Sequence, residues 1–434
     1  MRAALSRRTF LAASTALGTA SALGRTPTGG VVRWVLPWPV DGIDPHAPDD
    51  MAGALFGAAI TDSLYALDAE GRAYPALASG LPESVERGSR VRLRPNLMTA
   101  RGLGLDARDV LSSLLRSAQL AGVGLLSQLG RITLDPTDPL AIRVATPDAR
   151  LVSAVLASPV TAIVPRGFSP RTPDGTGAFR ATLSPGRALL ARSPVAARGP
   201  SFLERIEVRR ATTLSESLRA FETREAELSW LGEYLHRPRP GAVRFDAGTA
   251  GWVTLRAGPD AGEWGAPGVL QTLLDAIAPA QLSHLGLSGL PGAPRGSPAW
   301  TGAPAELLVA EDCPQLAQIG RQLATLMGRP GHEVRAVERP RAELAQRRRS
   351  GRFALLLEFT RRGAPGPRGA MLSLLSHLAP DLARRPPAHA PEDARRLGAT
   401  LRAGVVGELG IRGAQIPELS SLSRWELGAA WRQR

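Results

Sequence analysis

The hydrophobic positions of this chain alternate between strand-like and helix-like spacing most regularly over residues 305–359. Two segments there repeat apolar residues with the period of a helix. The three segments that flank them either alternate apolar and polar residues or are continuously apolar, as strands do. The predicted order is strand 305–310, helix 315–327, strand 332–338, helix 341–349 and strand 353–359. The unbroken apolar run from Phe353 to Leu357 is typical of a strand buried on both faces. The pattern therefore predicts an α/β domain with a mostly parallel sheet.

Shorter elements are predicted earlier in the chain. Their expected ranges are strands at 31–36 and 205–211 and helices at 52–63, 106–118 and 214–224. One of these helices has a well-defined start, because Asp106 is a suitable N-cap and Asp109 follows three residues later, as in a capping box.

The stretch TPDGTGAFRATL, residues 172–183, is rich in glycine and leads into an alternating strand pattern at Phe179. Phosphate-binding loops need a helix after their glycines, because free N–H groups and the helix dipole then face the anion. No such helix is predicted here. Gly175 and Gly177 therefore predict a tight structural turn rather than a phosphate site.

The first residues resemble an export signal. Arg7 and Arg8 precede a short, weakly apolar segment and a small-residue cleavage pattern at 20–22. This arrangement is typical of a twin-arginine signal over residues 1–22, cleaved near Ala22. A bilayer span needs about 20 apolar residues, and the segment is shorter and more polar than that. We therefore expect an exported protein that resides in the periplasm.

The formal charge is +14, from 53 basic and 39 acidic residues, and every basic residue is arginine because the sequence contains no lysine. In an exported protein, a solvated arginine-rich surface explains this charge best, followed by contact with an anionic membrane surface or a cell-wall polymer, so we expect no nucleic-acid partner. The 6 histidines show no metal-like spacing, and no serine lies in a G-x-S-x-G turn. Cys313 is single and lacks a basic neighbour. We therefore expect a non-enzyme without metal or cofactor.

Several stretches, taken in order, resemble the extracellular solute-binding proteins of the peptide, dipeptide and nickel class, which serve ABC importers. These stretches are GIDPHAP at 42–48, VRLRPNLMTARGLGLDARDV at 91–110, IVP at 163–165, GTGAF at 175–179, RGPSFLERIEVRRA at 198–211 and GRFALLLEF at 351–359. The family patterns that they resemble include "LRpgvkFhdGtplTAeDV" for the second and "GTGPY" for the fourth. The resemblance extends over residues 31–360.

The resemblance implies an α/β, two-lobed fold of the type II periplasmic-binding-protein kind, with a third, smaller domain. The implied boundaries are 1–22 for the signal peptide, 31–55 with 166–250 and 405–434 for lobe I, 56–165 for the smaller domain II, and 251–404 for lobe III. It also implies a monomer that passes a peptide or other small molecule to an ABC permease in the inner membrane.

The resemblance places a ligand in the cleft between the lobes. The implied ligand-binding residues are Trp38, Asp44, Trp230, Glu233, Tyr234, Phe359, Thr360, Arg361 and Arg362. Arg362 marks a departure, because the alignment puts it where dipeptide-binding members have an aspartate for the peptide's amino terminus. A guanidinium group would favour a carboxylate or phosphate instead. Its side chain points either into the cleft or to solvent.

Two functional hypotheses follow. The first is a periplasmic protein that captures a peptide-like or other small solute with an anionic group for an ABC importer. The alternative is a degenerate homologue that acts as an envelope sensor or scaffold without transport, because several family motifs are blurred and the chain is short. An exported hydrolase would need a nucleophile and a base, and the sequence indicates neither.

Overall fold

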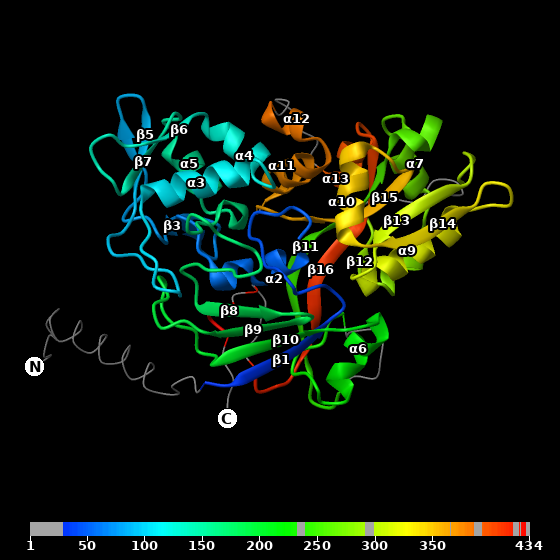
Figure 1. Ribbon diagram of the computed structural model, residues 1–434, viewed down its shortest axis with the longest axis horizontal. Helices are drawn as coiled ribbons and strands as arrows, with labels where there is room; N and C mark the ends of the chain where they lie inside the picture. Colours follow the sequence, from blue (N-terminus) through cyan, green and yellow to red (C-terminus); the bar gives the residue numbers. More distant parts are fainter. Residues whose placement is uncertain are drawn as a thin grey trace, which may run out of the picture.

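The computed structural model describes residues 29–231, 239–290, 299–364, 366–385, 393–419, 425 and 427–430. Figure 1 shows lobe I at the lower end, lobe III at the upper right and the smaller domain II at the upper left. The predicted signal peptide, residues 1–22, lies outside the described residues.

Lobe I is built on a sheet with the strand order β1-β10-β9-β8. Its strands are β1 (Val31–Leu36), β8 (Phe179–Ser184), β9 (Arg187–Arg192) and β10 (Arg205–Arg210). β1 is parallel to β10, and the other neighbours are antiparallel. Because side chains alternate along a strand, β1 directs Val32, Trp34 and Leu36 into the core. Helix α2 (Met51–Ile60) packs on that face through Phe56, whose ring lies 5.9 Å from Trp34, and α6 (Leu214–Glu222) packs on the other face.

Lobe III contains the predicted strand and helix alternation. Its strands are β11 (Val243–Ala257), β12 (Leu287–Ser288), β13 (Ala305–Ala310), β14 (Val334–Arg339), β15 (Leu355–Arg361) and β16 (Ala403–Gln415). Its helices are α7 (Val269–Asp275), α8 (Ala280–Ser283), α9 (Pro314–Met327), α10 (Arg341–Ser350), α11 (Pro367–Leu378), α12 (Pro380–Arg384) and α13 (Ala394–Gly398), with a 3₁₀ helix at Pro259–Gly265. As expected for a strand buried on both faces, Leu355 and Leu357 enter one core cluster while Leu356 enters another.

The prediction of a mostly parallel sheet in lobe III was wrong. The strand order is β12-β16-β11-β15-β13-β14, and β13 pairs in parallel with β14 and β15. The pairs β15-β11, β11-β16 and β16-β12 are antiparallel. The reason is that the long strands β11 and β16 were not predicted, and they extend the parallel unit with an antiparallel ladder.

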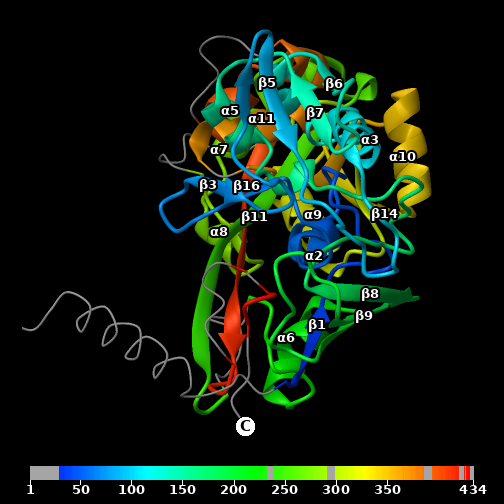
Figure 2. The ribbon, with the colours of Figure 1, turned by 90° about the vertical axis from the view of Figure 1, so that its left-hand side faces the viewer.

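β11 and β16 also connect the lobes. Figure 2 shows them as a long ribbon that runs from lobe III down beside the sheet of lobe I. Leu228 pairs with Trp34 of β1 on one side and with Gln415 of β16 on the other, which joins the ribbon to lobe I. The β11-β16 register shifts between Asp246 and Thr249, between Thr249 and Gly251, and between Val253 and Thr254. The first two shifts precede the part of β11 that pairs with β15, where the ribbon leaves the sheet of lobe III.

Domain II has its own hydrophobic core. Its strands are β2 (Tyr65–Leu67), β3 (Ala73–Pro75), β4 (Glu83–Val85), β5 (Gly88–Arg92), β6 (Ile132–Leu134) and β7 (Ala141–Val144), paired as a β2-β3 hairpin and a sheet in the order β4-β5-β7-β6. Its helices are α3 (Ala107–Ala118), α4 (Val123–Leu126) and α5 (Ala149–Val155), with 3₁₀ turns at Ser127–Leu129 and Pro159–Thr161. The capping box of α3 is confirmed: the Asp106 carboxylate accepts from the Asp109 backbone at 3.2 Å, and the Asp109 carboxylate accepts from the Asp106 backbone at 3.0 Å.

The exact domain boundaries given above remain predictions. Among the described residues, no single helix combines the length and apolar composition needed to cross a membrane, and α3 passes that test only together with the segment 123–129, across a bend of 114°.

Candidate functional site

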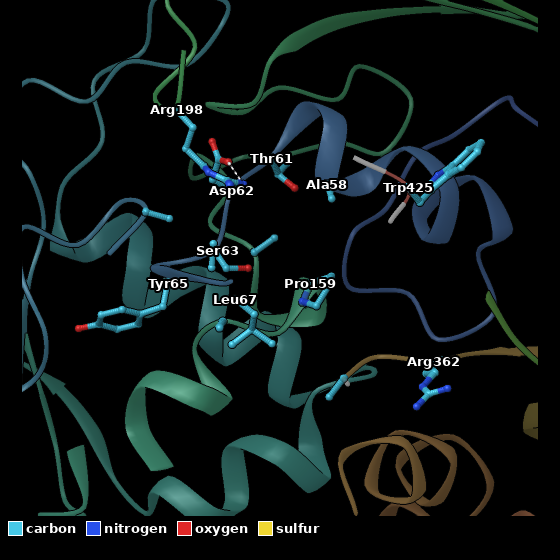
Figure 3. A pocket seen from close by; sticks show the side chains of 15 residues that line it. Ala58, Thr61, Asp62, Ser63, Tyr65, Leu67, Pro159, Arg198, Arg362 and Trp425 are labelled. Carbon is cyan, nitrogen blue, oxygen red and sulfur yellow. Dashed lines mark ion pairs between the residues drawn. The ribbon is translucent and has the colours of Figure 1, made fainter. Parts of the chain in front are cut away.

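A cavity of about 360 Å³ lies where the end of α2, the start of domain II and the end of β15 meet (Figure 3). Small or apolar side chains form most of its wall, and charged groups lie at its edges. The lining includes Ala58, Thr61, Asp62, Ser63, Tyr65, Leu67, Pro159, Arg198, Arg362 and Trp425. Volumes of this size are typical of small-molecule sites.

Asp62 lies just beyond the last turn of α2. The backbone of Thr61 ends the helix by donating to the Gly57 carbonyl at 2.9 Å, and the Asp62 carbonyl accepts from the Ile163 backbone at 2.8 Å. The Asp62 side chain is only 6% exposed. Its Oδ2 accepts a hydrogen bond from the Thr176 hydroxyl at 2.8 Å, and its Oδ1 lies 4.0 Å from Arg198 Nη1. Burial raises the pKa of Asp62 above its usual value, and Thr176 and Arg198 only partly oppose this effect.

The glycine-rich loop at 172–183 holds Thr176 in this position. A Cβ on Gly175 would lie 2.4 Å from the Ile60 carbonyl oxygen, and one on Gly177 would lie 2.6 Å from that of Ala59. The predicted structural turn is therefore a close approach of the loop to the last turn of α2. This approach brings the Thr176 hydroxyl to Asp62, so the loop supports the cavity wall.

Arg198 reaches the cavity from the loop before β10. Its Nη2 donates to the Tyr74 hydroxyl at 2.6 Å, and its guanidinium lies 5.7 Å from the centre of that ring. Because its side chain is 46% exposed, Arg198 neutralises the buried Asp62 carboxylate only weakly.

Arg362 follows the last residue of β15. Its backbone N–H donates to the Ala250 carbonyl at 2.8 Å, which fixes the chain at this point. Its side chain lines the cavity, on a different wall from Asp62 and Arg198 (Figure 3). Within the described part of the chain, its guanidinium has no hydrogen-bond or ion-pair partner.

Three of the four aromatic residues expected at the ligand, Trp38, Trp230 and Phe359, are buried in the core. The indole N–H groups of Trp38 and Trp230 both donate to Gln315 Oε1, at 2.6 and 2.7 Å. The Phe359 ring packs edge-on against Trp38, with centroids 5.5 Å apart. Trp38 and Phe359 line a separate cavity of about 90 Å³ beside α10. The structure therefore does not bring these aromatic side chains to the 360 Å³ cavity.

Asp44 and Arg361 hold the loop before α2. Asp44 forms a two-point ion pair with Arg116, at 2.8 and 2.5 Å. Arg361 is buried, and its Nη1 donates to the Pro45 carbonyl at 2.7 Å. Burial lowers the pKa of Arg361 to about 10, although nearby Asp50 and Asp44 oppose the shift. Both side chains thus have structural partners and lie outside the cavity lining.

The remaining predicted ligand-binding residues are Thr360, Glu233 and Tyr234. Thr360 is buried, and its hydroxyl lies 3.2 Å from that of Thr254. Glu233 and Tyr234 lie outside the described residues. Among the predicted site residues that the structure describes, only Arg362 lines the cavity.

Sequence reasoning missed Asp62, Arg198 and Trp425. Asp62 follows an apolar helix, and such a position alone does not identify a ligand-binding carboxylate. Its partners Thr176 and Arg198 are more than a hundred residues away in sequence. Among the described residues, no group of three or more His, Cys, Asp or Glu side chains is placed to hold a metal ion.

No known protein family and no curated protein matches the sequence. Solved structures do match its fold. DppA, an ABC transporter-associated periplasmic binding protein from Helicobacter pylori in complex with the peptide STSA, is 15% identical with a TM-score of 0.70, and the match covers 94% of this chain and 99% of that one. The chain has the fold of a periplasmic binding protein.

Two further matches have similar coverage. The binding protein AgaA from A. tumefaciens R10, in complex with agropinic acid, is 14% identical with a TM-score of 0.69, covering 93% of this chain and 99% of that one. The Escherichia coli murein tripeptide binding protein MppA is 12% identical with a TM-score of 0.69, covering 94% of this chain and all (100%) of that one. This periplasmic-binding-protein fold confirms the predicted two lobes with a smaller third domain.

Proposed function

We propose that the protein is an exported, periplasmic solute-binding protein that captures a small solute with an anionic group and passes it to an ABC permease. The cavity between α2, domain II and the end of β15 is the proposed binding site. Proteins with this fold include one in complex with a peptide and one in complex with agropinic acid. Their fold supports capture of a small molecule but does not identify the solute.

The observation that carries the proposal is the Arg362 side chain. Arg198 forms a long ion pair with Asp62, at 4.0 Å, whereas the Arg362 guanidinium adds a positive charge on a different wall and has no partner among the described residues. A guanidinium group that faces a cavity can form two parallel hydrogen bonds to a carboxylate or phosphate. The cavity is therefore complementary to a solute with at least one such group.

We propose binding rather than catalysis at this site. The hydroxyl groups in the lining already donate to backbone carbonyls: Thr61 to Gly57 at 2.8 Å and Ser63 to Ser158 at 2.8 Å. Neither arrangement activates the oxygen as a nucleophile, because a base must accept the proton. Closure of the lobes over the solute requires no covalent step.

A thermal-shift screen tests the proposal. The probes are a defined metabolite library, sorted into anionic, cationic, zwitterionic and neutral pools. The proteins are the wild type, Arg362→Gln, and Arg349→Gln as a control with the same charge change at an exposed position. We expect anionic members to raise the melting temperature of the wild type, since a ligand at a hundred times its Kd stabilises by about 2.7 kcal/mol.

Arg362→Gln should weaken binding of those members about tenfold, because a charged hydrogen bond to the ligand is lost. Arg349→Gln should bind like the wild type. Equal binding by all the proteins would refute Arg362 as the anchor. No response in any pool from a well-folded sample would refute solute capture.

A further inference from the structure

A second cavity, of about 280 Å³, adjoins the first. The two share Ala58, Asp62, Arg198 and Trp425 in their linings, so they meet at these side chains. Beyond that junction the side chains in its lining are apolar, and the polar part of its wall comes from Asp62, Arg198 and backbone groups. Its wall includes Leu55, Ala59, Ala178, Pro200, Phe202 and Leu427.

Trp425 is one of the side chains at the junction of the two cavities. Its indole N–H donates to the Leu55 carbonyl at 2.7 Å. Its ring lies 5.0 Å from that of Trp34 and stacks on Phe245 at 6.0 Å. Because its polar atom is already bonded and its ring is packed, Trp425 offers a fixed apolar surface to both cavities.

Asp62 is the polar group at the junction. Its Oδ2 accepts from Thr176, whereas Oδ1 is 4.0 Å from Arg198, beyond hydrogen-bonding distance. Within the described residues, no donor is bonded to Oδ1. Oδ1 therefore has only the long ion pair with Arg198, and a donor on a ligand could give it a hydrogen bond.

Three features therefore adjoin one another: a free guanidinium in the first cavity, an acceptor at the junction, and a second cavity whose other side chains are apolar. We infer that the solute is an elongated, amphipathic anion. Its anionic end binds Arg362, a hydrogen-bond donor near its middle binds Asp62, and its apolar end occupies the cavity behind Trp425. This inference rests on the proposed function, because it names the solute class of the same site.

The cavity sizes agree with this arrangement. The first cavity, at about 360 Å³, and the second, at about 280 Å³, each lie near the lower end of the range for ligand pockets. Together they accommodate a longer molecule than either one holds.

A series of N-acylglycines, from acetylglycine to decanoylglycine, tests the inference by calorimetry. Each member has a carboxylate, an amide N–H and an alkyl chain of increasing length. Once the alkyl chain passes Trp425, we expect affinity to rise about fourfold per methylene, the gain for burying one such group. The rise should stop when the second cavity is full.

Two variants test whether the second cavity causes the rise in affinity with chain length. Ala178→Phe places a ring in the second cavity only, so the rise should stop at a shorter chain while acetylglycine binds as to the wild type. Phe202→Ala removes part of the apolar wall of the second cavity. Because the Phe202 side chain is 42% exposed, this substitution should destabilise the fold little. It should weaken decanoylglycine severalfold and leave acetylglycine unaffected.

The outcomes separate this inference from the proposed function. If acetylglycine binds through Arg362 but affinity is flat along the series, or rises equally in Ala178→Phe and Phe202→Ala, the inference is overturned and anion capture stands. If no member binds and no anionic metabolite stabilises the protein, both are refuted.

Discussion

Glu358 of β15 should stabilise the protein strongly at neutral pH and weakly in acid. Its side chain is 12% exposed, and Arg348 Nη1 donates to its Oε1 at 3.0 Å. His377 Nε2 and Arg256 Nε each lie 3.4 Å from its Oε2. Burial alone would raise the pKa of Glu358, but His377 and the two arginines outweigh it and lower the pKa from 4.5 to about 2.

The sign and size of the effect follow from this pKa. Because the folded state holds Glu358 ionised more strongly than the unfolded state does, its stabilisation is complete above pH 4.5 and is lost as the pH falls toward 2. The lowered pKa of Glu358 raises the free energy of unfolding by about 3 kcal/mol at neutral pH and by about 1 kcal/mol at pH 3. Glu358→Gln preserves the shape of the side chain and removes its charge.

Urea unfolding followed by tryptophan fluorescence measures the difference. We expect Glu358→Gln to lower the free energy of unfolding by about 3 kcal/mol at pH 7 and by about 1 kcal/mol at pH 3. Glu86→Gln, at an exposed position, serves as the control and should change little at either pH. A Glu358→Gln deficit that is the same at both pH values would show that the charge of Glu358 is not the cause.

Two further substitutions test the packing around the site. Gln315→Leu removes the acceptor shared by the buried N–H groups of Trp38 and Trp230, and it should lower the free energy of unfolding by about 2–4 kcal/mol in urea. An unchanged unfolding midpoint would contradict the shared hydrogen bond. Gly177→Ala puts a Cβ 2.6 Å from the Ala59 carbonyl oxygen, and it should lower the free energy of unfolding by about 1–3 kcal/mol. Gly80→Ala, whose Cβ meets open space, is its control, and equal melting temperatures for the two variants would refute the close approach.

Local patterns predicted much of the fold. The Asp106 and Asp109 capping box and the apolar run at 353–357 were recognisable because each depends on neighbours within a few residues. β11 was missed because its first half carries Arg244 and Asp246 and is interrupted by glycine. Its pairing with β16, more than 150 residues later, determines that it is a strand, and no local pattern contains that information.

The site was less predictable for the same reason. Arg362 was found because it departs from the aspartate of the related loop. Trp38 and Trp230 were assigned to the ligand because the family resemblance places their segments at the cleft, yet Gln315 gives their N–H groups an internal partner. Asp62 and Trp425 gain their roles from Thr176 and Leu55, and only the folded chain brings these pairs together.

The ribbon of β11 and β16 constrains how the two lobes can separate. A paired ladder resists stretching and shear because either motion breaks backbone hydrogen bonds, but it bends easily where the pairing is already irregular. Any opening that preserves this ladder must therefore concentrate its change in backbone angles near Asp246, Thr249 and Gly251. The cleft would then open along one rotational coordinate, and a single pair of distance labels, one on each lobe, would suffice to follow it.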